Sequence, residues 1–210
     1  MIEYQRDPFA DMVRNNRPRI RQIKLKDGYN AKDLLWHGLT AYEGDNAQWL
    51  SEYDEIADWL TDNKHKGLML AGNCGMGKTL IAMHILPVIL KEYCEDDCSI
   101  FCGNKLSDID VYSAYQMNEA YRDEKKRSTL FYKHPIMIDD FGTESEINIF
   151  GERHMVFSEI VDDAEKNGRL LILTTNLTSK KIEAQYDVRI RDRLRGLVKK
   201  IGFEGKSLRK

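Results

Sequence analysis

The sequence predicts an α/β protein with one parallel sheet of about five strands flanked by helices. Short apolar runs at residues 67–71, 136–138 and 170–173 have the continuous hydrophobicity of strands that are buried on both faces. Stretches with helical periodicity lie between them, and residues 47–62 have apolar side chains at helical spacing. Strands and helices that alternate along a chain favour a parallel sheet, because each crossover needs a connection as long as a helix.

A glycine-rich turn joins the first apolar run to the helix that follows it. Residues 72–79 fit the phosphate-binding pattern of Gly, four residues, Gly-Lys-Ser/Thr. The glycines allow backbone N–H groups to face phosphate oxygens, and the helix N-terminus adds a favourable dipole. We expect Lys78 to reach the β- and γ-phosphates and the Thr79 hydroxyl to ligate Mg²⁺. The expected cofactor-binding set of this segment is Gly72, Asn73, Cys74, Gly75, Met76, Gly77, Lys78, Thr79 and Leu80.

Two carboxylates end the second apolar run, at Asp139 and Asp140. Ligands of parallel α/β sheets bind at the carboxyl ends of the strands, so these side chains belong to the expected site. Asp139 is predicted to hold Mg²⁺, mostly through water, and Asp140 to orient or deprotonate the attacking water. The alternative is that the pair caps a turn before Gly142.

The third apolar run ends on polar side chains, Thr174, Thr175 and Asn176. Asn176 lies at the same predicted sheet edge as Asp139, where its amide could hydrogen-bond both the γ-phosphate and the lytic water. Asparagine after a strand is also a common turn former, which is the alternative interpretation.

The totals are those of a globular protein, with 210 residues, 42% of them hydrophobic and 31% charged. The 32 basic and 34 acidic side chains nearly cancel, so nucleic-acid binding would have to come from a local patch. The sequence predicts no membrane span and no signal peptide, and we expect a cytoplasmic location. Four cysteines are expected to be free thiols, and their spacing is a weak metal signal.

Residues 1–46 have no clean periodicity and are predicted to form a basic arm before a domain over residues 47–210. This arm is either a solvated tail or a strand that contacts DNA or a partner protein. Its basic residues are Arg14, Arg17, Arg19, Arg21, Lys24 and Lys26.

Further elements are expected downstream. We expect the helix after the phosphate loop to kink at Pro87. The remaining predicted elements are a strand from Cys98 to Cys102, helices over about 112–126 and 150–166, and a last strand near 197–203. Four arginines follow one another closely at Arg189, Arg191, Arg193 and Arg195.

The order of these parts resembles the AAA+ ATPases of the DnaC/IstB type, over roughly residues 48–210. Besides the phosphate loop, the likeness rests on Ile-Asp-Asp-Phe-Gly-Thr-Glu at residues 138–144, Thr-Thr-Asn-Leu, Tyr-Asp-Val-Arg-Ile-Arg-Asp-Arg-Leu at residues 186–194, and a terminal Lys-Ser-Leu-Arg. The resemblance implies that Asn176 is sensor 1, that Arg193 is the arginine finger, with Arg189 as the second candidate, and that Arg209 is the sensor 2 arginine. Asp140 stands where most AAA+ proteins have Glu, which favours slow turnover.

The resemblance implies an ATPase of DNA replication, with ATP and Mg²⁺ as cofactors. The preferred function is a helicase loader that assembles as a homo-oligomer on single-stranded DNA and binds a replicative helicase. The alternatives are an IstB-like transposition ATPase that acts on duplex DNA and a module that binds ATP without hydrolysing it.

Overall fold

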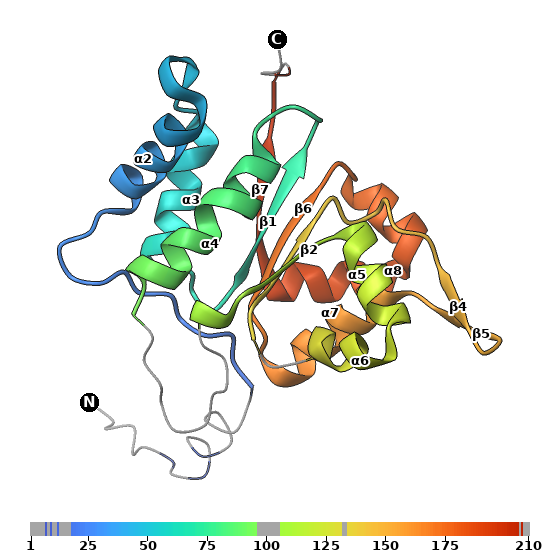
Figure 1. Cartoon of the computed structure of the whole chain (residues 1–210). Helices are drawn as coiled ribbons and strands as arrows, with labels where there is room; N and C mark the ends of the chain where they lie inside the picture. The colour runs from blue at the N-terminus through green and yellow to red at the C-terminus, as the bar shows by residue number, and fades with distance from the viewer. Residues whose placement is uncertain are drawn as a thin grey trace.

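The computed structural model shows one sheet between two layers of helices (Figure 1). The chain is described at residues 18–95, 106–131 and 134–205, and at residues 7, 9, 12 and 207. The predicted strand from Cys98 to Cys102 therefore lies outside the described residues. None of the helices in the described part of the chain is long and apolar enough to cross a membrane.

Five parallel strands form the central sheet, in the order β2-β3-β6-β1-β7. β3 and β6 are buried at every position, which agrees with their apolar sequences. This sheet confirms the predicted fold class. The strands are β1 Gly67–Gly72, β2 Asp110–Ser113, β3 Ile136–Asp139, β6 Leu171–Thr175 and β7 Val198–Phe203.

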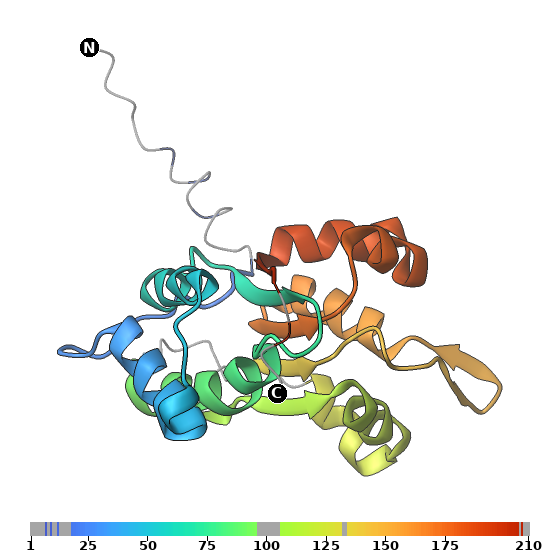
Figure 2. The same ribbon diagram turned by 90° about the horizontal axis from the view of Figure 1, so that it is seen from above.

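Helices cover both faces of the sheet, as Figure 1 and the view from above in Figure 2 show. One face carries α3 (Ser51–Thr61) and the helical run after the phosphate loop, and the other carries α7 (Val156–Asn167) and α8 (Ser179–Leu197). α5 (Ala114–Arg122) starts directly after β2, with a capping box in which the amide of Gln116 donates to the Ser113 hydroxyl over 3.2 Å. Short helical segments complete the fold: η1 Gly44–Asn46, η4 Leu106–Asp108, α6 Glu124–Arg127 and η5 Ser128–Phe131.

The helical run after the phosphate loop contains two π-helical stretches, one on each side of Pro87. It consists of η2 (Leu80–Ile85), α4 (Leu86–Val88) and η3 (Ile89–Tyr93). Proline lacks the N–H donor that a regular α-turn would use, and π-turns are a known way to accommodate such a break in the ladder. Pro87, where a kink was expected, thus lies between two stretches of wider helical turns.

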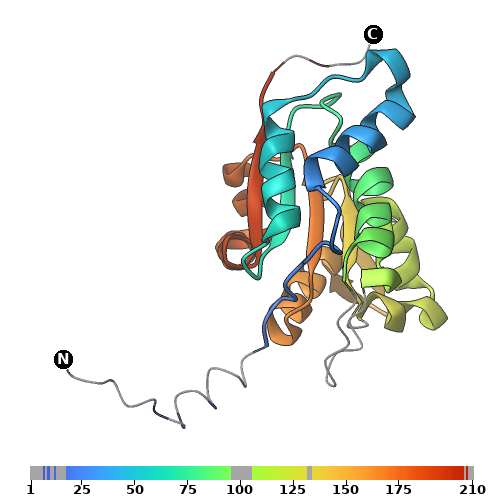
Figure 3. The same cartoon turned by 90° about the vertical axis from the view of Figure 1, so that its left-hand side faces the viewer.

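The expected basic arm over residues 1–46 includes several side chains that the structure places in the main core. Ile20 and Ile23 are buried, and α2 (Ala31–Glu43) buries Leu35 and Leu39 beside α3 (Figure 3). Asn30 caps α2 by accepting hydrogen bonds from the amides of Lys32 and Asp33. α2 is 13 residues long and buries only Ala31, Leu35 and Leu39, which leaves a weak apolar periodicity in the sequence.

A hairpin replaces the first part of the helix expected over residues 150–166. Strands β4 (Ile147–Ile149) and β5 (Glu152–His154) pair antiparallel, and α7 begins only after them. Phe150 and Gly151 form the tip with φ angles of 53° and 89°, so the turn needs left-handed backbone at both positions. The described helix α8 is also interrupted, at Asp187, where φ is 79° and ψ is 170°.

We predict that Leu35→Ala lowers the free energy of unfolding by about 2–5 kcal/mol, because it removes a fully buried side chain from the main core. Chemical denaturation measures this change. His37→Ala, at an exposed position on the same helix, is the matched control and should change stability by less than about 0.5 kcal/mol. An unchanged midpoint for Leu35→Ala would mean that α2 does not unfold together with the sheet.

Candidate active site

The phosphate-binding pattern lies between β1 and the helical run that starts at Leu80. Gly75 and Gly77 have φ angles of 78° and 79°, the left-handed backbone that glycine adopts at little cost. A side chain at Gly77 would also come within 3.1 Å of the Tyr53 hydroxyl. The loop is therefore shaped by backbone geometry that only glycine supports well.

Lys78 is 4% exposed, and its ammonium group points back across the loop. It donates to the carbonyl oxygens of Gly72 and Asn73, over 2.9 and 2.7 Å, and to the side-chain oxygen of Asn176, over 2.9 Å. Gly72 and Asn73 thus contribute to the site by holding this lysine. A buried ammonium needs such acceptors, because desolvation of a charge is costly.

Asp139 is the last residue of β3, is buried, and accepts hydrogen bonds from two hydroxyl groups. The Thr79 hydroxyl lies 3.1 and 3.2 Å from the two carboxylate oxygens, and the Thr174 hydroxyl lies 2.5 Å from one of them. A carboxylate beside a hydroxyl is a donor set of hard oxygens, which fits Mg²⁺. Thr174 was not assigned a role from the sequence, although it precedes Asn176 by two residues on β6.

Asp140 and Asn176 meet at the neighbouring strand ends. The Asn176 amide nitrogen donates to the Asp140 carboxylate over 3.0 Å, while its oxygen accepts from Lys78. Asp140 has a φ angle of 54°, and its backbone N–H donates to the Thr174 hydroxyl over 2.8 Å. Asn176 therefore bridges the lysine of the loop and the second carboxylate, which brings three of the predicted site residues together.

A pocket of about 530 Å³ opens over the loop. Cys74, Gly75, Met76, Gly77, Lys78, Thr79, Leu80, Asp140 and Asn176 line one part of it. The other part comes from segments near the N-terminus that were not predicted to reach the site, through Leu39, Glu43, Asn46, Gln48 and Tyr53. The helical spacing of Tyr53 was visible in the sequence, but its place against the phosphate loop is a tertiary contact that spacing does not reveal.

Tyr53 lines the part of the pocket that is formed by segments near the N-terminus. Its ring makes an edge contact with Trp49 at 5.6 Å and lies 6.1 Å from the ring of Phe203 on β7. Burial, and then the carboxylates of Glu52 and Glu43, raise the pKa of Tyr53 to about 12, so the hydroxyl stays neutral at physiological pH.

Arg193 lies on α8 and is turned toward α7 of the same chain. It forms ion pairs with Asp162 and with Glu165, the latter at 2.8 Å, and its side chain is 19% exposed. Arg189 also pairs with Asp162, at 2.7 Å. Arg193 does not line the pocket, and Arg209 lies outside the described residues.

The basic residues expected in an arm are engaged within the chain where the structure describes them. The Arg21 guanidinium and the Lys26 ammonium donate to the carbonyl oxygens of Glu95 and Glu92, and Lys24 pairs with the Glu95 carboxylate at 2.9 Å. These contacts gather at the C-terminal end of η3, where positive charge complements the helix dipole. Arg14 and Arg17 lie outside the described residues.

Among the described residues, no three His, Cys, Asp or Glu side chains gather into a possible metal site. Cys98 and Cys102 of the weak cysteine signal lie outside them.

Comparison with known proteins identifies the fold through solved structures. No family model matches the chain, and no curated protein matches it. A crystal structure of DnaI is similar over 88% of this chain and 88% of that chain, with 17% identity and a TM-score of 0.51. Domain III of the replication initiation protein DnaA from Thermotoga maritima covers 86% of this chain, which matches 68% of that one, with 13% identity and a TM-score of 0.52. The structure of AMPPCP-bound DnaA from Aquifex aeolicus is similar over 87% of this chain and 53% of that chain, with 16% identity and a TM-score of 0.50.

The chain has the AAA+-like P-loop NTPase fold, a parallel sheet of five strands between layers of helices. The likeness that the motifs indicated is thus confirmed for the fold.

We predict that Cys74 reacts with iodoacetamide much faster than Cys94. Cys74 is exposed and lines the pocket over the glycine-rich loop, whereas Cys94 is buried. Peptide mass spectrometry after a short pulse separates the two sites, and unfolding in urea is the control that exposes Cys94. Equal labelling of both cysteines in the folded protein would contradict the placement of the loop.

Proposed function

We propose that this chain is an ATPase of DNA replication that assembles on single-stranded DNA and loads a replicative helicase. The observation that carries the proposal is the bridge from Lys78 through Asn176 to Asp140, which joins the ends of β1, β6 and β3 around one pocket. The solved structures support it, because DnaI shares the fold and the Aquifex DnaA structure holds the ATP analogue AMPPCP.

Each residue of the site has a distinct task in this proposal. Lys78 and the loop amides bind the β- and γ-phosphates, and Thr79 with Asp139 holds Mg²⁺, which would neutralise charge on the phosphates. Asp140 accepts a proton from the attacking water or orients it, and Asn176 keeps that carboxylate and Lys78 in fixed relation. The adenine base of ATP would lie against the part of the pocket that α2 and α3 line.

Arg193 is proposed to act on the nucleotide of a neighbouring copy in a homo-oligomer. A guanidinium stabilises charge that develops on γ-phosphate oxygens. Within one chain, Asp162 and Glu165 neutralise Arg193 away from the pocket. Assembly would therefore have to exchange at least one of these carboxylates for phosphate.

The nucleic acid that stimulates turnover distinguishes the candidate functions. Stimulation by single-stranded DNA supports the loader, and stimulation by duplex DNA supports a transposition ATPase. ATP binding without turnover under either condition would make the chain a binding module. A pull-down from the native host that recovers a hexameric helicase would identify the partner.

We predict that Lys78→Ala weakens ATP binding by at least about 10- to 100-fold, because it removes charge-assisted hydrogen bonds to the phosphates. Asp139→Asn should retain most of the affinity and lose Mg²⁺-dependent turnover. Titration with a fluorescent ATP analogue and a phosphate-release assay measure the two effects. Lys91→Ala removes the same charge from an exposed position on the same helical run and is the control. Parent-like affinity in Lys78→Ala would show that the nucleotide binds elsewhere.

We predict that Arg193→Ala binds ATP with parent-like affinity and that its DNA-stimulated turnover rate is about a thousandfold lower. An arginine finger contributes a rate enhancement of this size. Arg191→Ala is the matched control, since Arg191 lies on the same helix and pairs with Glu183. A mixture of Arg193→Ala with Lys78→Ala should regain activity, because some interfaces then combine an intact loop with an intact arginine. A mixture that co-assembles and stays inactive would remove the support for action between subunits.

A further inference from the structure

Two motifs in the sequence contain a residue to which no function has been assigned. Glu144 ends the motif at residues 138–144, and Tyr186 begins the motif at residues 186–194. The structure brings these two side chains together: the Tyr186 hydroxyl donates to one Glu144 oxygen, and the Gly142 amide donates to the other over 2.7 Å. Glu144 is 9% and Tyr186 4% exposed, so this is a buried carboxylate with both oxygens engaged.

The loop that this carboxylate holds begins at Asp140. A non-glycine residue with a φ angle of 54° is unfavourable on its own and persists where surrounding contacts fix it. The Thr143 hydroxyl donates to the Asp140 carbonyl over 2.8 Å, and the side-chain amide of Gln185 donates to the Gly142 carbonyl over 3.1 Å. Gly142 has a φ angle of 100°, and a Cβ there would lie 2.3 Å from a methyl carbon of Leu177. The backbone from 140 to 144 is thus held from both sides.

Aromatic packing keeps Tyr186 in place beside this loop. The rings of Phe141 and Phe157 stack at 4.4 Å, and the Tyr186 ring lies 5.0 Å from that of Phe157. Burial, and then the Glu144 carboxylate, raise the pKa of Tyr186, so the hydroxyl remains a donor throughout the physiological range.

We propose that Glu144 and Tyr186 are positioning residues for Asp140, an inference that rests on the proposed ATPase function. Glu144 fixes the turn that aims the Asp140 carboxylate at Asn176, and Tyr186 ties that turn to α8. The helix breaks at the next residue, Asp187, whose carboxylate then caps the second half of α8 by accepting from the Ile190 amide over 3.0 Å. The same contact therefore sets where the arginine-bearing half of α8 begins.

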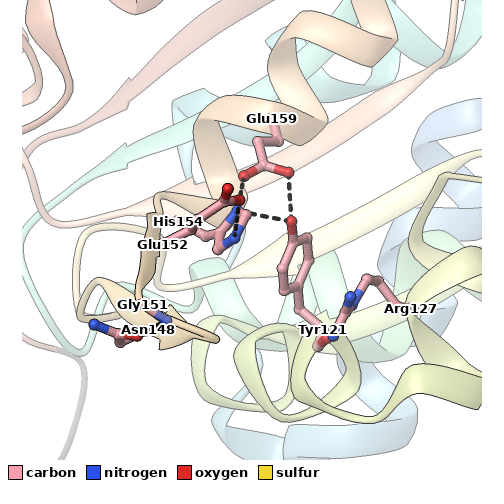
Figure 4. Close-up of polar contacts among 7 residues, drawn as sticks. All are labelled: Tyr121, Arg127, Asn148, Gly151, Glu152, His154 and Glu159. Carbon is pink, nitrogen blue, oxygen red and sulfur yellow. Dashed lines mark hydrogen bonds and ion pairs between the residues drawn. The ribbon is translucent and has the colours of Figure 1, made fainter.

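Tyr186→Phe tests this inference, because it removes one hydroxyl and keeps the ring. The chain offers a matched control in Tyr121, a buried tyrosine whose hydroxyl donates to Glu159 over 2.7 Å and lies 3.0 Å from His154 (Figure 4). We expect Tyr186→Phe to lower kcat by about tenfold while KM for ATP changes by less than about twofold. Tyr121→Phe should lose comparable thermal stability without a comparable loss of kcat.

Glu144 variants provide an independent test. Glu144→Ala should lower kcat at least as far as Tyr186→Phe, and Glu144→Gln, which keeps one acceptor oxygen, should restore part of the loss. Hydrogen exchange of the 140–144 amides should increase in Tyr186→Phe and remain as in the parent in Tyr121→Phe.

Equal kcat and equal exchange in the two tyrosine variants would overturn the positioning role. Failure of the proposed function looks different, because the parent itself would then neither bind nor hydrolyse ATP. If the parent binds ATP and hydrolyses none, exchange of the 140–144 amides decides the inference alone.

Discussion

The buried ammonium group of Lys78 is the interaction on which the rest of the site depends. A charge that is 4% exposed is tolerated only where oxygen acceptors replace water, and three such oxygens surround it. Two are the carbonyl oxygens of Gly72 and Asn73, and the third belongs to Asn176, the residue directly after β6. The requirement to solvate one side chain therefore connects the phosphate loop to the far strand end, and through Asn176 to Asp140.

The sheet and its functional edge could be predicted because their signals are local. A phosphate loop is encoded within eight residues and confirmed by the strand and helix beside it. β3 and β6 are apolar throughout because both faces are buried, and parallel strands bring Asp139, Asp140 and Asn176 to one edge. Once the strands were assigned, the meeting of these residues followed from topology.

The remaining features depend on contacts between distant segments, which periodicity does not encode. β4 and β5 are three residues each, too short to show an alternating pattern. The break in α8 occurs at Asp187, which has a positive φ angle, and an aspartate in a helical stretch does not indicate such a break. The ion pair between Arg193 and Asp162, about thirty residues earlier, is a tertiary contact of the same kind. The pairing exists because α7 and α8 lie together on one face of the sheet.

The pocket has walls from two regions of the chain, the phosphate loop on one side and α2, η1 and α3 on the other. A ligand that touches both walls would connect α2 to the phosphate loop through noncovalent contacts. By linkage, a ligand present at 100 times its Kd adds about 2.7 kcal/mol to the free energy of any opening motion that releases it. Filling the pocket would thus raise the free energy needed to separate α2 from the phosphate loop, so the attachment of α2 to the domain would report occupancy.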